Sequence, residues 1–123
     1  ALEHIHKRVG QPVGVFIEVN LAEEGSKAGF TVDGLKRAIP YIAGLGKVRV
    51  DGLMAVPPYF EDVEKVRPHF ARLRGLRDEI RAMAVANMPL GHLSMGMSHD
   101  YEVAVEEGAT VVRIGTALFG RRR

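Results

Sequence analysis

The chain has 123 residues, a formal net charge of +2 and an apolar content of 46%, which suits one globular domain with its own core and leaves no room for two. Acidic and basic residues are interspersed, unlike the basic stripe of a nucleic-acid-binding protein. No apolar run reaches the length of about eighteen residues that a membrane span requires. There is no cysteine, so neither disulfide nor thiolate chemistry is expected, and a reducing cytoplasm is the expected location.

Apolar, β-branched segments alternate with segments of helical spacing along the chain. Residues 1–10 have the spacing of the end of a helix. Strands are expected at residues 13–20, 48–56, 92–95 and 110–114. Helices are expected from residue 31 or 33 to about 43, from about 66 to 84, and from 100 to 107.

Particular residues are expected to set the ends of these helices. Thr31 or Asp33 can cap the first helix. Pro40 within it is expected to kink or shorten the helix, because proline lacks the N–H that a helix interior uses. Ser98 is the expected N-cap of the last helix, with Asp100 in its first turn.

Because strands and helices alternate, consecutive strands should be parallel and covered by helices. Four such units make either a small open sheet or half of an eightfold barrel. The sequence opens on a helix with no strand before it, which favours a fragment. Barrel enzymes often hold a phosphate in the loops after strands seven and eight, and small-residue loops follow the last two strands here. The prediction is therefore an α/β fold, the second half of a TIM (β/α)8 barrel.

The segments after the third and fourth expected strands pass from an apolar run into glycine and hydroxyl residues. Ser94 and Gly96 lie in the first segment, and Gly115 and Thr116 lie in the second. Glycine lets backbone N–H groups approach an anion, and hydroxyl groups add donors, so a bipartite phosphate site is expected. The alternative is that Ser94 only ends a strand and that Gly115 and Thr116 only form a tight turn.

Arg113 lies at the apolar end of the last expected strand, where an unpaired charge would be costly. It therefore needs an anion or a ring nitrogen as its partner. An ion pair with Glu18 or Asp51 across the sheet is the structural alternative. No histidine pair has a metal-ligand spacing that converges with carboxylates, so no metal site is expected.

These motifs together resemble the pyridoxal phosphate homeostasis protein family, over nearly the whole chain. The matching residues are 15–20, 24, 26–27, 29–30, 52–54, 93–98 and 112–120. The resemblance implies a single barrel of fold type III, similar to the N-terminal domain of alanine racemase, of which residues 1–123 are the C-terminal half. It implies that pyridoxal 5′-phosphate is carried on a Schiff-base lysine in an N-terminal half that this sequence lacks. It also implies vitamin B6 homeostasis without demonstrated catalysis.

The resemblance implies roles for individual residues. Ser94 matches the family's phosphate-binding serine, and Arg113 is placed to face the pyridine nitrogen of the cofactor. Lys27 matches a loop lysine that would line the mouth of the site and could act as a second amine. Met54 could line the pocket, although filling of the core would explain it as well.

Two classes of enzyme and a purely structural module are the alternatives. A fold type III racemase or decarboxylase would need a further β-domain after the barrel, and this chain ends shortly after Gly120. Another phosphate-binding TIM-barrel enzyme would need carboxylates or a lysine at strand ends. Neither Glu18 nor Asp51 is expected to end a strand and point at the loops.

A half-barrel would leave two sheet edges and its inner face uncovered. We therefore expect self-association or pairing with the missing half-barrel. The small-molecule cofactor is the other expected partner, and neither nucleic acid nor a membrane is expected.

Overall fold

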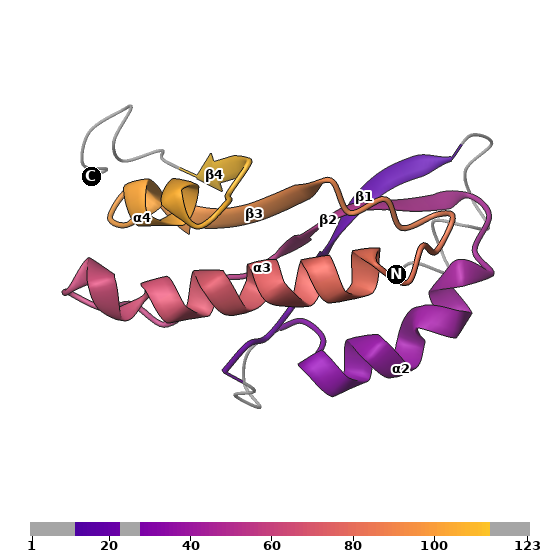
Figure 1. Ribbon diagram of the computed structural model, residues 1–123, viewed down its shortest axis with the longest axis horizontal. Helices are drawn as coiled ribbons and strands as arrows, with labels where there is room; N and C mark the ends of the chain where they lie inside the picture. Colours follow the sequence, from indigo (N-terminus) through magenta and orange to yellow (C-terminus); the bar gives the residue numbers. More distant parts are fainter. Residues whose placement is uncertain (1–11, 23–27, 114–123) are drawn as a thin grey trace.

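The computed structural model describes residues 12–22 and 28–113, which form a four-stranded sheet with helices against one face (Figure 1). The strand order is β1-β2-β3-β4, and every neighbouring pair is parallel. The elements are β1 (Val13–Glu18), α2 (Val32–Ala43), β2 (Val48–Met54), the 3-10 helix η1 (Val63–Lys65), α3 (Arg67–Arg81), β3 (His92–Met97), α4 (Tyr101–Glu106) and β4 (Val111–Arg113). The expected α/β alternation and parallel pairing are confirmed.

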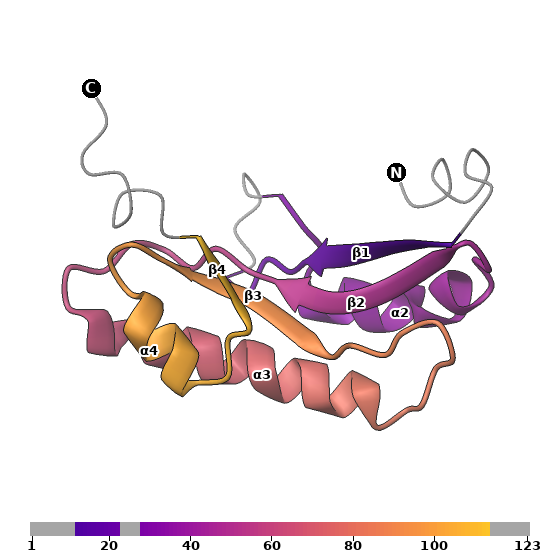
Figure 2. The ribbon, with the colours of Figure 1, turned by 90° about the horizontal axis from the view of Figure 1, so that it is seen from above.

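The hydrophobic core lies between the sheet and the helices, which Figure 2 shows on the same side of the sheet. Successive side chains of a strand point to opposite faces, so alternate strand residues enter this layer. Its strand members include Ile17, Val48, Val50, Leu53, Leu93 and Met95, and its helix members include Leu35, Ile39, Ile42, Phe70, Leu73, Leu76, Ile80, Val103 and Ala104. Burial of these spaced helix residues holds the helices on the sheet.

Helix α2 is capped by one of the two residues that the sequence offers, Thr31, while Asp33 lies in its first turn. Thr31 is the N-cap, and its side-chain oxygen accepts the N–H of Gly34 at 2.9 Å. Pro40 was expected to kink or to shorten the helix; it does not shorten it, since α2 continues to Ala43, and the kink stays a prediction. Pro40 lies on the exposed side of the helix, where water can bond the carbonyl group that the missing N–H leaves unpaired.

The ends of α3 and α4 differ from the prediction. Helix α3 stops at Arg81, and at Ala84 the backbone φ is +55°, outside the helical region. The expectation that Ser98 caps α4 is wrong, because the N-cap is Asp100. The Asp100 carboxylate accepts the N–H of Met97 at 2.8 Å, and this turn places the start of the helix beyond Ser98.

An ion-pair network fastens α4 to the start of α3. The Arg67 guanidinium donates to Glu64, Glu106 and Glu107 over 2.7–2.8 Å, and Arg74 donates to Glu107 at 2.8 Å. The hydrogen bonds from Arg67 hold the pKa of Glu64 and of Glu107 below the ordinary value for a carboxyl. The position of α4, and with it the loop that leads from β3, therefore depends partly on charge.

The other face of the sheet, called the inner face below, is not covered by any of the helices within the described ranges (Figure 2). None of the helices in these ranges is long and apolar enough to cross a membrane. Among the predicted site residues that the structure describes, Met54 and Ser94 lie on the inner face, because Leu53, Leu93 and Met95 beside them are in the core.

Candidate functional site

The carboxyl ends of the four parallel strands lie at one end of the sheet. Met54 of β2 pairs with Glu18 of β1 and with Ser94 of β3. Arg113 of β4 pairs with Met97 of β3. The sheet thus brings three predicted site residues, Met54, Ser94 and Arg113, onto neighbouring strands at this end.

Ser94 is a buried polar residue within β3, with only 6% of its surface exposed. Its neighbours Leu93 and Met95 are fully buried in the core, so alternation along the strand turns Ser94 to the inner face. Met54 shares this face, because Leu53 beside it is in the core. A serine hydroxyl both donates and accepts hydrogen bonds, which suits it to an anionic oxygen.

Gly96 is needed for the packing of α4 against β3. Its φ is +103°, a left-handed conformation that favours glycine. A Cβ at this position would lie 2.6 Å from the Cβ of Ala104 and 3.3 Å from the Cα of Tyr101. The close approach of the helix gives Gly96 a packing role beside the phosphate role that the sequence predicts.

The side chain of Arg113 crosses β3 to reach β2. Its Nη1 donates to Met54 Sδ over 3.7 Å, although β3 lies between the two strands. Among the described residues, no ion pair joins Arg113 to Glu18 or to Asp51, the partners of the structural alternative. Asp51 instead accepts from the guanidinium of Arg49, which lowers the pKa of the Asp51 carboxyl.

Aromatic side chains cover the inner face closer to the amino ends of the strands. The rings of Phe16 and His92 stack with centroids 6.2 Å apart and an angle of 25° between their planes. Gly52 makes this possible, because a Cβ there would lie 2.8 Å from the Phe16 ring and would also meet the His92 carbonyl oxygen. His92 Nδ1 bonds to the Thr110 hydroxyl at 3.1 Å.

Sequence reasoning missed this aromatic cover of the inner face. One signal was present in the alternation within β1. Val15, Ile17 and Val19 enter the core, so the positions between them, including Phe16, had to face the other side. What the alternation could not show is that Gly52 opens a path for the ring across β2.

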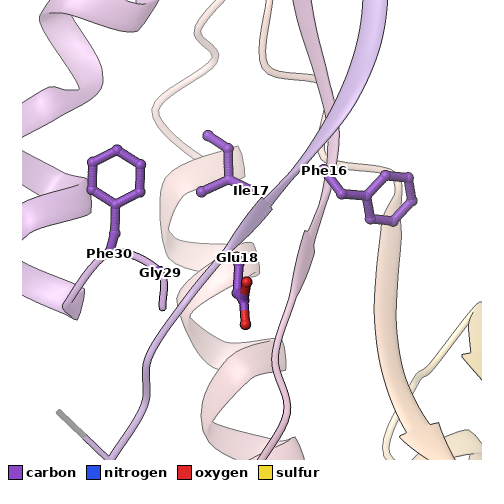
Figure 3. A pocket seen from close by; sticks show the side chains of 5 residues that line it. All are labelled: Phe16, Ile17, Glu18, Gly29 and Phe30. Atoms are coloured by element: carbon purple, nitrogen blue, oxygen red, sulfur yellow. The ribbon is translucent and has the colours of Figure 1, made fainter. Parts of the chain in front are cut away.

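An open pocket of about 450 Å³ lies along the outer edge of β1 (Figure 3). The residues that line it are Phe16, Ile17, Glu18, Gly29 and Phe30. Figure 3 shows Phe16 and Ile17 pointing to opposite sides of the strand, so the pocket follows an edge of the sheet. Beside Glu18, the N–H of Phe30 donates to the Glu18 carbonyl at 3.0 Å.

Glu18 is the last residue of β1 and lines this pocket. The expectation was that Glu18 does not end a strand and point at the loops; Glu18 does end β1, and the direction of its carboxylate relative to the loops stays a prediction. Asp51 lies inside β2, as expected. The carboxylate at the end of β1 is thus available at the same end of the sheet as the predicted site.

Three predicted site residues, Lys27, Gly115 and Thr116, lie outside the described residues. The second half of the expected phosphate site is therefore still a prediction. Within residues 12–22 and 28–113, no group of three or more His, Asp or Glu side chains could hold a metal ion.

The chain is similar in sequence to a known protein family and to several proteins that carry the same name. All of residues 1–123 match the family model described as the alanine racemase N-terminal domain. The chain is 55% identical over 109 residues to the pyridoxal phosphate homeostasis protein of Aquifex aeolicus, covering 89% of this chain and 47% of that protein. It is 42% identical over 111 residues to the protein of that name in Pseudomonas aeruginosa, covering 90% and 46%. The chain spans about half the length of these curated relatives.

Solved structures show the same likeness in three dimensions. PipY of Synechococcus elongatus with pyridoxal phosphate bound has a TM-score of 0.82 at 32% identity, covering 96% of this chain and 54% of that one. Alanine racemase of Corynebacterium glutamicum has a TM-score of 0.69 at 13% identity, covering 98% and 33%, and shows likeness of fold alone. The predicted family resemblance and the predicted relation to an alanine-racemase-like barrel are confirmed.

Proposed function

Because this chain belongs to the alanine racemase N-terminal domain family, we propose that residues 1–123 form the C-terminal half of a single barrel domain that binds pyridoxal 5′-phosphate and serves cofactor homeostasis. The relatives from Aquifex aeolicus and Pseudomonas aeruginosa are named for this role, and PipY has the cofactor bound in a solved structure. Within the chain itself, the supporting observation is the buried Ser94 on the inner face, between Met54 and the strand of Arg113.

The residues at this end of the sheet fit such a ligand. Ser94 offers a hydroxyl and Arg113 offers a guanidinium on the same face, which suits an anionic group attached to a heteroaromatic ring. In this proposal the phosphate is held by Ser94 and by the backbone at Gly96, Gly115 and Thr116. The bound cofactor supplies an aldehyde that reacts with amines.

Arg113 is proposed to donate a hydrogen bond to the ring nitrogen. A guanidinium stays charged at any accessible pH and does not release its proton. A partner of this kind leaves the ring nitrogen unprotonated, which makes the ring a weaker electron sink. This chemistry favours carriage of the cofactor over catalysis, so we propose that the protein is not an enzyme. A fold type III racemase or decarboxylase is the alternative.

Two further parts of the proposal concern Lys27 and the location of the protein. Lys27 is proposed to line the mouth of the site, and Met54 to line its wall. The cytoplasmic location expected from the absence of cysteine remains part of the proposal.

The outer edge of β1 is proposed to pair with another strand, from a second copy or from the other half of a longer barrel. The N–H groups of Val13 and Val19 donate to carbonyl groups on the β2 side of the strand. The backbone groups of successive residues point to opposite sides of a strand, so those of Gly14 and Phe16 point to the outer edge. Within residues 12–22 and 28–113, no strand pairs with these groups. An open strand edge is a template for pairing, and the pocket of Figure 3 lies beside it. Sedimentation velocity tests this point. A chain that remains monomeric, both alone and when mixed with the N-terminal half of the Aquifex aeolicus relative, would contradict it.

Isothermal titration with pyridoxine 5′-phosphate and with pyridoxine tests the binding function. Neither compound has the aldehyde, so surface lysines cannot react with them. We expect the chain to bind the phosphorylated compound more tightly, and Ser94→Ala to reduce that preference by about tenfold, because a hydrogen bond to a charged oxygen is worth about 1.5–3 kcal/mol. Equal affinity of the wild-type chain for the two compounds would remove the proposal.

A further inference from the structure

We propose that His99 is a positioning residue for the phosphate group, an inference that rests on the proposed function. His99 lies in the turn that leads from β3 to α4. Its Nε2 is 2.8 Å from the carbonyl oxygen of Phe60, and its ring packs on that of Tyr59 with centroids 4.8 Å apart. A carbonyl can only accept a hydrogen bond, so Nε2 carries the hydrogen.

The Phe60 carbonyl is held in place because the Phe60 side chain packs on α3. The Phe60 ring stacks on that of His69, in the first turns of α3, with centroids 5.6 Å apart. Pro57 and Pro58 restrict the chain that leads from β2 into this loop. Figure 1 shows that α3 begins at the end of the sheet where β3 ends. His99 therefore ties the turn after β3 to a part of the fold that the core holds in place.

The turn itself is closed by two hydrogen bonds between the same pair of residues. The N–H of Met97 donates to the Asp100 carboxylate at 2.8 Å, and the N–H of Asp100 donates to the Met97 carbonyl at 3.1 Å. Gly96, with its left-handed φ, directly precedes the turn. These bonds set the shape of the turn, and the bond from His99 to Phe60 sets its orientation against the loop from β2.

A preformed turn binds an anion more tightly than a mobile one, because less conformational entropy is lost on binding. His99 would act through the backbone of the turn and would make no contact with the ligand. Its loss should therefore weaken the interaction with the phosphate group and leave the interaction with the ring unchanged. A loss of affinity for the phosphorylated compound alone indicates a positioning role, whereas a general loss of stability would weaken the binding of both compounds.

The test compares the affinities of the chain for pyridoxine 5′-phosphate and for pyridoxine by isothermal titration. We expect His99→Ala to weaken binding of the phosphorylated compound about three- to tenfold, the effect of one net hydrogen bond, and to leave pyridoxine unchanged. His99→Gln keeps an N–H donor and should restore most of the affinity. Glu61→Ala removes an exposed side chain next to Phe60, in the loop after β2, and serves as the matched control. Amide hydrogen exchange at Met97 and Asp100 should become faster in His99→Ala without any ligand.

Each outcome decides the point. An equal loss for both compounds, or no loss for either, would overturn the role of His99, as would unchanged exchange at the turn. If the wild-type chain shows no preference for the phosphorylated compound, the proposed function fails first and the inference fails with it. If His99→Ala does not fold, His99→Leu replaces it, because leucine fills the space beside Tyr59 and has no donor for the Phe60 carbonyl. It should show the same selective loss for the phosphorylated compound, and an unchanged preference in a folded His99→Leu would overturn the role of His99.

Discussion

The guanidinium of Arg113, at the end of β4, donates to the thioether sulfur of Met54, at the end of β2, over 3.7 Å. The contact spans β3, the strand that carries Ser94. A thioether is a weak acceptor, so it can hold the guanidinium on the inner face without satisfying the charge. In the proposed function, the other donors of Arg113 serve the ligand.

Removal of the Arg113 guanidinium should weaken ligand binding without unfolding the chain. We expect Arg113→Ala to reduce affinity for both pyridoxine and its 5′-phosphate by about tenfold or more, because the lost bond involves a charged donor. Titration calorimetry measures the affinities, and circular dichroism checks the fold. Arg81→Ala, which removes the same charge from the exposed end of α3, should bind normally. Collapse of the fold in Arg113→Ala alone would instead show that the guanidinium has a structural role.

The sulfur of Met54 can be tested by a substitution that preserves its volume. Met54→Leu should change the free energy of unfolding by less than about 1.5 kcal/mol, as volume-conserving swaps do. It should weaken pyridoxine binding by a few fold, because Arg113 loses its acceptor and becomes less ordered. Urea unfolding and titration calorimetry give the two values. Unchanged affinity would show that Met54 only fills space.

Gly52 should not tolerate a side chain. A Cβ there would meet the His92 carbonyl oxygen and would lie 2.8 Å from the Phe16 ring, so we expect Gly52→Ala to lower the free energy of unfolding by about 1–3 kcal/mol. Gly75 in α3 has no atom within 4 Å of the corresponding position. Gly75→Ala should therefore stabilise by about 0.5–1 kcal/mol through helix propensity. Urea denaturation of the two variants measures both changes in the free energy of unfolding. An unchanged free energy of unfolding in Gly52→Ala would contradict the packing described.

Asn87 should be required for the end of α2 and the turn that follows it. Its Nδ2 donates to three backbone carbonyl groups, those of Ile42 at 2.9 Å, Leu45 at 3.1 Å and Val48 at 3.0 Å. Loss of these bonds in Asn87→Ala should cost about 1–3 kcal/mol. Asn87→Asp should cost more at pH 7, because a carboxylate would face three carbonyl oxygens, and should recover as the pH is lowered and the carboxyl gains a proton. Urea unfolding at pH 7 and pH 4 tests this; an Asp variant less stable at pH 4 than at pH 7, relative to wild type, would argue against it.

The network around Arg67 should make the attachment of α4 sensitive to acid. Its hydrogen bonds lower the pKa of Glu64 and of Glu107 in the folded chain, from an ordinary value of 4.5. A depressed carboxyl pKa contributes stability above the unfolded pKa, and this contribution is lost as the pH falls through the folded pKa. The melting temperature of Arg67→Met should therefore lie below that of wild type at pH 7, and the difference should shrink below about pH 4.5.

Glu107→Gln is the matched variant for this network, since it removes the charge that Arg67 and Arg74 share. Its effect should fade in acid in the same way, and both differences should decrease at high salt because the groups are partly exposed. A difference for Arg67→Met that persists at pH 3 would assign the effect to packing of the arginine stem.

The local pattern of residues was sufficient for much of the fold. The β-branched runs, the helical stripes and the cap at Thr31 depend on neighbours in sequence, so the order of strands and helices and their parallel pairing followed from them. Residues of the strands and of the loops after them, 93–98 and 112–120 among them, carried the resemblance that implied roles for Ser94 and Arg113.

What the sequence determined by itself was this order of elements, because side-chain alternation and helical spacing are local properties. Only the tertiary structure decided which side chains meet across these elements. Pro40 is tolerated because it faces solvent, and Gly96 is needed because α4 packs against β3. Arg113 reaches Met54 across a third strand, a contact between residues far apart in the chain that no local pattern contains.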